Sequence, residues 1–377
     1  MKASPPLYLE LTDRVREAID AARGGAPAAL ASKGAMRDVI PGLSDVDYRL
    51  VLSTDAPEIW RRVGAAFAEA MLAFANAHPD GWRLIEHMPA IGCSSDALDA
   101  RPVCWERLTW EPLWASSADL LVTPTSPTND GLAGWWAGKL AGYQPPYDAR
   151  RDPPINVASA ELPRFPAFSL IWHFYAPAVL AATQLLGQSQ VRTKWDALRW
   201  RAEQGIEPAQ QALAIAEADF VNPTSATLAR ACEADVHQLA QLATDDARPW
   251  DALKVMADGL TLSLRDRRLW ALATARTYVH RWWFYAHAPQ GFDVVAVLRI
   301  DRGHVGRFTL GPVRDSREAM EAMRGHAQDG ARFDAAIEAL MAEHRNTDTS
   351  RPRDTFLAMR EQYLVVLEAL ERWHAAA

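Results

Sequence analysis

The sequence predicts an α+β protein, in which an N-terminal mixed sheet with flanking helices is followed by a mainly helical C-terminal domain. Three observations support this fold class. Most of the β-prone runs lie between Leu30 and Trp110. A stretch rich in Pro, Gly and Asp follows at residues 124–166, and from Phe168 onward the apolar residues recur mostly at helical spacing. With 377 residues, the chain is long enough for two domains rather than one.

We therefore expect residues 1–125 to form the α+β domain and residues 166–377 to form the helical domain. Residues 126–165 would be an irregular linker between them. A connection of this length without regular structure is usually functional or mobile.

The N-terminal elements are predicted in chain order from periodicity and from helix-capping residues. Tyr8–Ala22 has apolar residues at helical spacing, and Leu30–Lys33 and Val46–Leu52 are apolar runs of strand length. Thr54 or Asp55 can cap the following helix, which has Pro57 in its first turn. Two further strands are expected at Trp82–Met88 and Pro102–Trp110.

Most of the C-terminal half shows helical periodicity. The one β-prone exception is Asp293–Ile300, which is expected to pair with Gly306–Leu310 across a turn. The predicted helices are Phe168–Gly187, Val191–Gln204, Pro208–Ala218, Ser225–Leu242, Trp250–Ala257, Arg265–Phe284, Ser316–Arg324, Phe333–His344 and Pro352–Trp373.

Composition excludes several classes of function. The net charge is −7 and no long basic run occurs, which argues against nucleic acid as the main partner. Three cysteines without metal-ligand spacing, and an N-terminus without a signal-peptide pattern, are typical of a cytoplasmic protein. The most apolar helix, Ser169–Leu186, is too short and too interrupted to span a membrane. The fifteen tryptophans are either core residues or stacking surfaces for a ring-shaped ligand.

Residues 34–52, GAMRDVIPGLSDVDYRLVL, contain the most informative pattern of the chain. Asp45 and Asp47 are two residues apart in a β-prone run, so both side chains leave the same face of a strand. Two carboxylates this close repel each other unless a cation neutralises them. Carboxylate oxygens combined with substrate phosphates are the ligand set that Mg²⁺ prefers.

A small-residue turn, Lys33-Gly34-Ala35, precedes the acidic pair by about ten residues, and Ser44 stands directly before Asp45. Glycine lets backbone N–H groups approach a phosphate closely. Over about the first third of the chain, this order resembles the nucleotidyltransferase superfamily. Its signature is a Gly-Ser or Gly-Gly turn followed by an acidic pair on the next strand. Ala35 departs from that signature because it replaces the usual serine.

The resemblance implies that Asp45, Asp47 and a third acidic residue are catalytic and hold Mg²⁺, with two ions in total. We expect the third carboxylate to be Glu106, which lies in the predicted strand at residues 102–110. Glu86 is the second candidate and Glu111 the third.

Other residues are expected to bind the nucleotide, which would be ATP or another nucleoside triphosphate. They are Gly34, Ala35, Arg37, Ser44 and Lys194, with Lys33 as a further cation. For the general base the sequence offers Glu161, Asp152 and His173, and nothing selects among them.

The resulting hypothesis is a Mg²⁺-dependent enzyme that moves a nucleoside monophosphate, AMP from ATP, onto a hydroxyl of a small molecule. The layout resembles that of aminoglycoside-type antibiotic nucleotidyltransferases, which indicates the class of acceptor. Two alternatives stay open: a nucleotide-binding or regulatory module whose catalytic site has decayed, and a nucleotidyltransferase that acts on a protein or an RNA end. The sequence does not indicate the oligomeric state.

Overall fold

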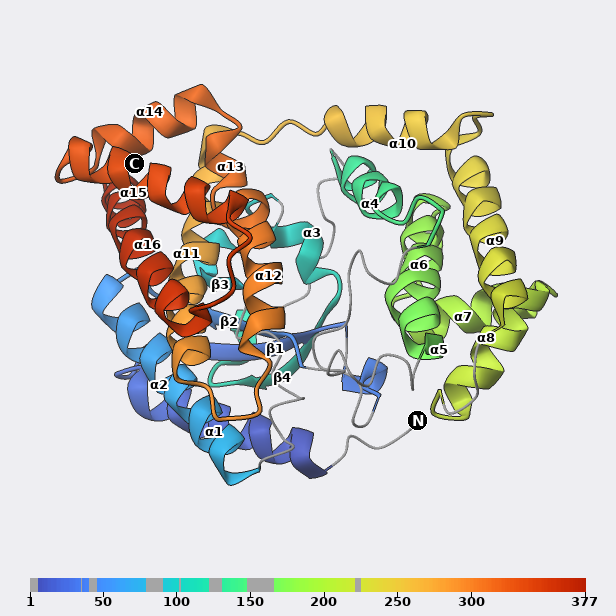
Figure 1. Ribbon diagram of the computed structural model, residues 1–377, viewed down its shortest axis with the longest axis horizontal. Coiled ribbons are helices and arrows are strands. Elements are labelled where there is room, and N and C mark those ends of the chain that lie inside the picture. The colour runs from blue at the N-terminus through green and yellow to red at the C-terminus, as the bar shows by residue number, and fades with distance from the viewer. Residues whose placement is uncertain are drawn as a thin grey trace. The chain divides into compact units, whose positions relative to one another are not determined.

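The computed structural model describes most of the chain as two compact units (Figure 1). Unit 1 comprises Met1–Met36, Ser44–Thr123 and Leu262–Ala377, and unit 2 comprises Arg37–Leu43 and Pro124–Thr261. The described residues are 6–34, 36–40, 46–78, 91–101, 103–121, 131–147, 166–220 and 225–377. The chain therefore enters unit 2 twice, and the second, longer passage separates Ser44–Thr123 from the C-terminal residues of unit 1.

Unit 1 contains a four-stranded mixed sheet in the order β3-β2-β1-β4. Strand β1 is antiparallel to both of its neighbours, and β2 and β3 are parallel. The register pairs Ala29 with Val51 and Ala31 with Arg49. The strands are β1 (Ala28–Lys33), β2 (Tyr48–Leu52), β3 (Ile91–Ser94) and β4 (Trp110–Ala115).

Helices α1 (Pro6–Ala22) and α2 (Pro57–Ala77) cover one face of this sheet. Alternate residues of β2 point to that face, where the Tyr48 ring packs edge-on against Phe67 with centroids 5.7 Å apart. The buried Tyr48 hydroxyl lies 2.9 Å from Thr12 Oγ1 of α1. Both helices have buried apolar residues at spacings of three and four, as the sequence predicts.

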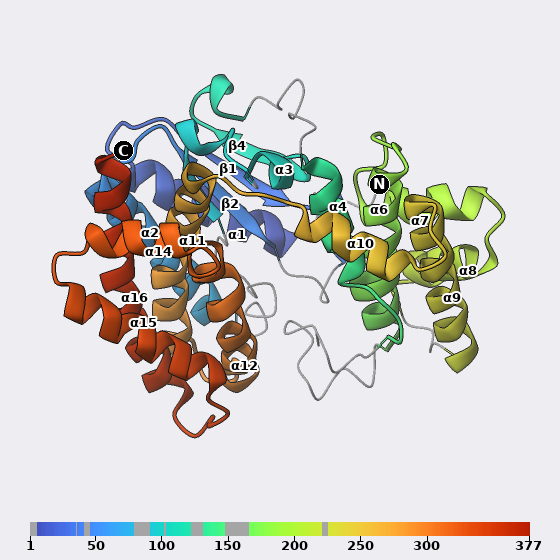
Figure 2. The same cartoon turned by 90° about the horizontal axis from the view of Figure 1, so that it is seen from above.

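Helix α11 (Leu264–His287) packs against the edge strand β3 and against α2, and its first half joins the core on the other face of the sheet. Val51, Cys93 and Ala29 form one core cluster with Leu269, Trp270 and Ala273. A capping box at Ser263 and Asp266 begins this helix, which also packs against α16 (Pro352–Ala375) (Figure 2).

The remaining elements of unit 1 are short turns and helices. They are η3 (Ser95–Ala97), α3 (Val103–Arg107), η4 (Ala118–Leu121), α12 (Val294–His304), the π-helix η7 (Val305–Thr309), α13 (Gly311–Arg314), α14 (Arg317–Gly325) and α15 (Gly330–Arg345).

The described part of unit 2 is helical around an aromatic core. Trp172 lies at its centre, with ring centroids 5.0 Å from Trp195 and 5.7 Å from Phe220. Its elements are α4 (Leu132–Ala141), α5 (Pro166–Phe168), the π-helix η6 (Ser169–Tyr175), α6 (Ala176–Leu185), α7 (Lys194–Glu203), α8 (Glu207–Glu217), α9 (Ala226–Thr244) and α10 (Pro249–Asp258). The 3₁₀ turn η1 (Met36–Asp38) extends across the boundary between the units.

The α+β class is confirmed, but three predicted strands are wrong. One is Gly306–Leu310, which was expected to pair with residues 293–300 and lies mostly in the π-helix η7. Residues 102–110 were expected to be a strand, and the described part of that stretch forms α3 and the start of β4. The β-prone run 293–300 is helical in α12, where Val294, Val297 and Leu298 are buried at the three- and four-residue spacing of one helix face. The expected linker, 126–165, contains α4. The predicted strand at residues 82–88 lies outside the described residues.

The compact units also differ from the expected domain boundaries. Residues 262–377 were expected to belong to one helical domain with residues 166–261, yet they pack in the same unit as the N-terminal sheet. The sheet needs an apolar cover on its second face, and α11 supplies it with Leu269 and Trp270.

Candidate functional site

The predicted phosphate-binding turn directly follows β1. Gly34 has φ +76°, a left-handed conformation that glycine adopts without strain, and a side chain at this position would meet no described atom within 4 Å. The Gly34 N–H donates to the carbonyl of Thr109 at 2.9 Å, while the Lys33 N–H donates to the carbonyl of Asp47 at 2.8 Å. The glycine turn and the acidic segment therefore lie side by side, although thirteen positions separate them in the sequence.

Asp47 lies among cations at the start of β2. Its Oδ2 is 4.0 Å from Lys33 Nζ, and its Oδ1 is 3.9 Å from Arg49 Nη1. The side chains of Asp47 and Lys33 are 25% and 36% exposed, so a ligand can reach both. Ala35, Ser44 and Asp45 lie outside the described residues, and for Arg37 the structure describes the backbone but not the side chain.

Glu106 lies in α3 and forms a buried ion pair with Arg49. Arg49 Nε donates to Glu106 Oε2 at 2.9 Å, and Nη2 donates to Oε1 at 3.1 Å. The indole N–H of Trp110 also donates to Oε2, at 3.1 Å. Burial opposes the charge of Arg49, but Glu106 and Asp47 outweigh it, so the pKa of Arg49 is raised. Both oxygens of the expected third metal ligand thus accept hydrogen bonds from protein donors.

Helix α11 connects the sheet core to this polar region. Ala273 packs near Val51. From there, eight helical residues lead to Arg281 over about 12 Å, and four strand residues lead from Val51 to Asp47 over about 13 Å. Gly92, which pairs with Leu50 of β2, lies against Thr277, and the charges of Arg49 and Asp47 act on the pKa of Tyr278, so this part of α11 lies near the start of β2.

A second buried ion pair lies at that end of α11. Arg281 donates to both oxygens of Asp301, at 3.1 and 2.5 Å, and Trp282 Nε1 donates to Oδ2 at 2.9 Å. His304 Nδ1 lies 3.3 Å from Asp301 Oδ1 and 3.4 Å from the hydroxyl of Tyr278. The His304 side chain is 22% exposed, whereas Asp301 is fully buried.

Tyr278 links the two ion pairs electrostatically. Burial raises the pKa of Tyr278, Arg281 and Arg49 act to lower it, and Asp301 and Asp47 act to raise it. We define the polar cluster as the eight residues that this end of the sheet brings together. They are Lys33, Asp47, Arg49, Glu106, Tyr278, Arg281, Asp301 and His304.

Lys194, the expected phosphate cation, belongs to unit 2 and begins α7. Its backbone N–H donates to Oδ2 of the buried Asp38 at 3.0 Å, and its ammonium lies 5.4 Å from the centroid of the Trp172 ring. Trp172 Nε1 in turn donates to the Asp38 carbonyl at 3.1 Å. Burial raises the pKa of Asp38 to about 7, although the α7 N-terminus and Lys194 oppose that shift.

His173, a candidate general base, is a core residue of unit 2. Burial and the nearby charge of Lys194 lower the pKa of His173 to about 3, and its ring packs edge-on against Phe168. It therefore stays neutral near pH 7. The alternatives Asp152 and Glu161 lie outside the described residues, as does Glu86.

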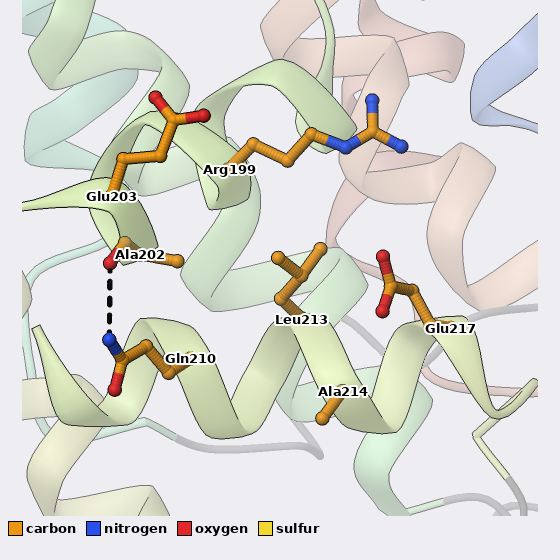
Figure 3. A pocket seen from close by; sticks show the side chains of 7 residues that line it. All are labelled: Arg199, Ala202, Glu203, Gln210, Leu213, Ala214 and Glu217. Atoms are coloured by element: carbon orange, nitrogen blue, oxygen red, sulfur yellow. Dashed lines mark hydrogen bonds between the residues drawn. The ribbon is translucent and has the colours of Figure 1, made fainter. Parts of the chain in front are cut away.

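A depression of about 310 Å³ lies between α7 and α8 in unit 2 (Figure 3). Leu213, Ala202 and Ala214 line it, and Glu203, Arg199, Gln210 and Glu217 lie around these apolar side chains. Gln210 Nε2 donates to the Ala202 carbonyl at 3.3 Å, and the seven residues present no converging set of polar groups to a ligand. None of them is a predicted site residue.

Comparison of the chain with protein-family models, with curated proteins and with solved structures finds no match. No group of three or more metal-ligating side chains occurs among the described residues, which do not include Asp45 or Glu86. Within the same residues, none of the helices has the length and apolar character needed to cross a membrane.

Sequence reasoning missed five members of the polar cluster: Arg49, Tyr278, Arg281, Asp301 and His304. The signal for Arg49 was present, because it is the next residue after Asp45 and Asp47 on the same face of the strand. Asp301 and His304 have the i,i+3 spacing that joins side chains on a helix. They were missed because the preceding residues, 293–300, were assigned to a strand.

Proposed function

We propose that the chain is a Mg²⁺-dependent nucleotidyltransferase whose reaction centre is the polar cluster. The observation that carries this proposal is the adjacency of the Gly34 turn and Asp47, which the hydrogen bond from Lys33 N–H to the Asp47 carbonyl maintains. A left-handed glycine beside an accessible carboxylate can receive a phosphate and its metal ion together. This is the arrangement that the resemblance to nucleotidyltransferases implies.

The donor chemistry of Asp47 fits Mg²⁺, because it is a partly exposed carboxylate. Asp47 and Asp45 would hold the ion. Bound Mg²⁺ would neutralise charge on the phosphates. Lys33 adds a further positive charge beside the turn, and Gly34 leaves room for phosphate oxygens.

Glu106 fits a positioning role better than a metal-binding one. Its two oxygens hold Arg49 in a fork that keeps this cation beside Asp47. The prediction that Glu106 is a metal ligand remains untested. In the proposal its charge fixes Arg49, which would stabilise the negative charge of the transferred group.

The proposed reaction transfers AMP from ATP to a hydroxyl of a small molecule. The acceptor oxygen bonds to the α-phosphorus, the bond to the bridging oxygen breaks, and pyrophosphate leaves. The acceptor class, an aminoglycoside-like polyhydroxylated amine, is supported by the sequence resemblance and by the net charge of −7, which suits a cationic acceptor.

Replacing Asp47 by Asn tests this proposal. We expect D47N to lose pyrophosphate release from MgATP, because an amide cannot replace a carboxylate at a magnesium site. The free energy of unfolding should change by less than about 1 kcal/mol, because the side chain is partly exposed. D13N, at an exposed position of α1, is the control. Near-normal turnover by D47N would remove the proposed metal site.

A second candidate function is a nucleotide-binding module without catalysis. The pairing of Glu106 with Arg49 favours it, because that pairing uses a carboxylate that a two-metal site would need. Ala35 in place of serine points the same way. Calorimetry separates the two candidates, since this module would bind ATP but would release no pyrophosphate with any of a panel of hydroxylated acceptors.

A further inference from the structure

We propose that the carboxylate of Glu111 occupies the phosphate-binding turn of the ligand-free protein, and that a polyphosphate must displace it in order to bind. This inference rests on the proposed function and adds a self-inhibiting contact to the same site. The N–H of Met36, which follows Gly34 in the turn, donates to Glu111 Oε2 at 2.5 Å. All three residues belong to unit 1.

Strand pairing places Glu111 beside the turn. Strands β1 and β4 are antiparallel, with Ser32 opposite Glu111 and Lys33 opposite Trp110. Lys33 is the last residue of β1, so Glu111 is level with the residues that lead directly into the turn. Opposed residues of antiparallel strands share one face of the sheet, with Cβ atoms about 4.5–5.5 Å apart. Glu111 therefore reaches the Met36 N–H from the neighbouring strand.

The contact gives the turn an acceptor of the kind that a phosphate would supply. Carboxylate and phosphate oxygens are both negatively charged, and both accept charge-assisted hydrogen bonds from backbone N–H groups. The Gly34 N–H donates to the Thr109 carbonyl, which is part of the backbone that leads into β4. The acceptor of Met36, in contrast, is a partly exposed side chain that can rotate away. Glu111 and a phosphate therefore compete for the Met36 N–H.

A second, independent observation is the hydroxyl of Ser32. This residue is 2% exposed, and its Oγ has no hydrogen-bond partner among the residues that the structure describes. A buried hydroxyl normally has a partner, because leaving it unsatisfied costs free energy. Ser32 lies directly opposite Glu111 on the same face of the sheet. A phosphate that replaces Glu111 would accept from the Ser32 hydroxyl as well as from the Met36 N–H.

Glu111 and Glu106, both expected as candidates for the third metal ligand, differ in how firmly they are held. Glu106 forms a buried ion pair with Arg49, and separating that pair would leave a buried charge without its partner. Glu111 is partly exposed and accepts from a neutral backbone group, so its carboxylate regains water when it leaves. Of the two, Glu111 is therefore the carboxylate that an arriving ligand can displace.

Calorimetric binding of MgATP and of inorganic tripolyphosphate tests the inference. We expect E111A to lower the Kd of both probes about tenfold, because no charge-assisted hydrogen bond has to be broken first. E111Q should lower them about threefold, since its amide oxygen still accepts but is neutral. Adding S32A to E111A should reverse about threefold of the gain. D119N, at an exposed position of η4, removes one charge elsewhere in unit 1 and should leave both Kd values within twofold.

Amide hydrogen exchange at Met36 gives a second measurement. Without ligand, this N–H should exchange about tenfold faster in E111A than in wild type, and tripolyphosphate should restore its protection. If wild type binds MgATP and E111A binds it no more tightly, the inference is wrong and the proposed function stands. If E111A gains affinity for tripolyphosphate but neither protein binds MgATP, the inference stands and the proposed function fails. If neither probe binds to either protein, both are wrong.

Discussion

The polar cluster of unit 1 and the Asp38 site of unit 2 both place a carboxylate beside a lysine, but they treat the charges differently. Asp47 and Lys33 lie 4.0 Å apart and are both partly exposed. Asp38 is buried, accepts a hydrogen bond from the α7 N-terminus and has its pKa raised to about 7 by burial. The lysine beside it lies over the Trp172 ring. The first arrangement suits an incoming ligand, whereas the second joins η1 to α7.

The largest change in stability should come from breaking the buried ion pair between Glu106 and Arg49 in the polar cluster. E106Q removes the charge that balances the buried Arg49, and leaving one partner of a buried ion pair uncompensated costs about 3–5 kcal/mol of unfolding free energy. Urea denaturation measures it. E361Q, on an exposed surface of α16, should change stability by less than about 0.5 kcal/mol. Equal stabilities of the two variants would show that the ion pair of Glu106 does not stabilise the folded protein.

The next effect concerns the pH dependence that Asp38 adds to stability. Its folded-state pKa is raised above the ordinary value of 3.8, so the native state binds the proton more tightly than the unfolded chain does. Stability from this group is therefore fully present below pH 4 and is lost as the pH rises to about 7. D38N keeps an acceptor oxygen for Lys194 N–H but does not titrate.

Unfolding of wild type and D38N should be compared at several pH values between 4 and 8. Relative to D38N, wild type should lose roughly 2–4 kcal/mol over this range, since one pKa unit corresponds to about 1.4 kcal/mol. If the difference in unfolding free energy between wild type and D38N stays constant with pH, the pKa of Asp38 is not raised by burial.

A smaller effect separates the two lysines. K33A should weaken MgATP binding about tenfold, equivalent to about 1.4 kcal/mol, because it removes a charge beside the phosphate turn. The same titration with K194A tests the sequence prediction that Lys194 also contacts the triphosphate. If K194A weakens binding and K33A does not, the assignment of the phosphate site to unit 1 is wrong.

An effect of similar size should come from the turn glycine. G34A forces a side chain into a left-handed conformation, which costs about 1–2 kcal/mol in the absence of any ligand. G325A, at a helical position of α14 with open space around it, should instead stabilise by about 0.5–1 kcal/mol. Thermal unfolding of both variants measures the difference in sign. Equal shifts would contradict the left-handed turn.

Local pattern was enough to predict the elements whose periodicity is strong. Helices such as α1, α9 and α16 lie close to their expected bounds, as do β1 and β2, because their apolar residues repeat at one period. The proximity of Gly34 and Asp47 was also expected, since a turn after one strand and the start of its antiparallel neighbour meet at one end of a sheet.

The polar cluster could be predicted only in part, because half of it comes from the distant C-terminal segment. Nothing in the local sequence indicates that Tyr278 or Asp301 belongs beside β2, since that depends on α11 covering the sheet. Glu106 was found as a candidate, but its pairing with Arg49 was not, because a side-chain fork depends on tertiary placement. The assignment of 293–300 to a strand hid the spacing of Asp301 and His304.

Because unit 1 combines N-terminal and C-terminal segments, it cannot be completed until the end of the chain has been synthesised. The strands emerge early, yet the apolar face that contains Val51 and Cys93 receives its cover only when residues 264–287 have been synthesised. Unit 2 is complete before that point. Newly made β2 and β3 therefore stay open to unwanted association during translation, and a chain truncated before α11 should be prone to aggregate.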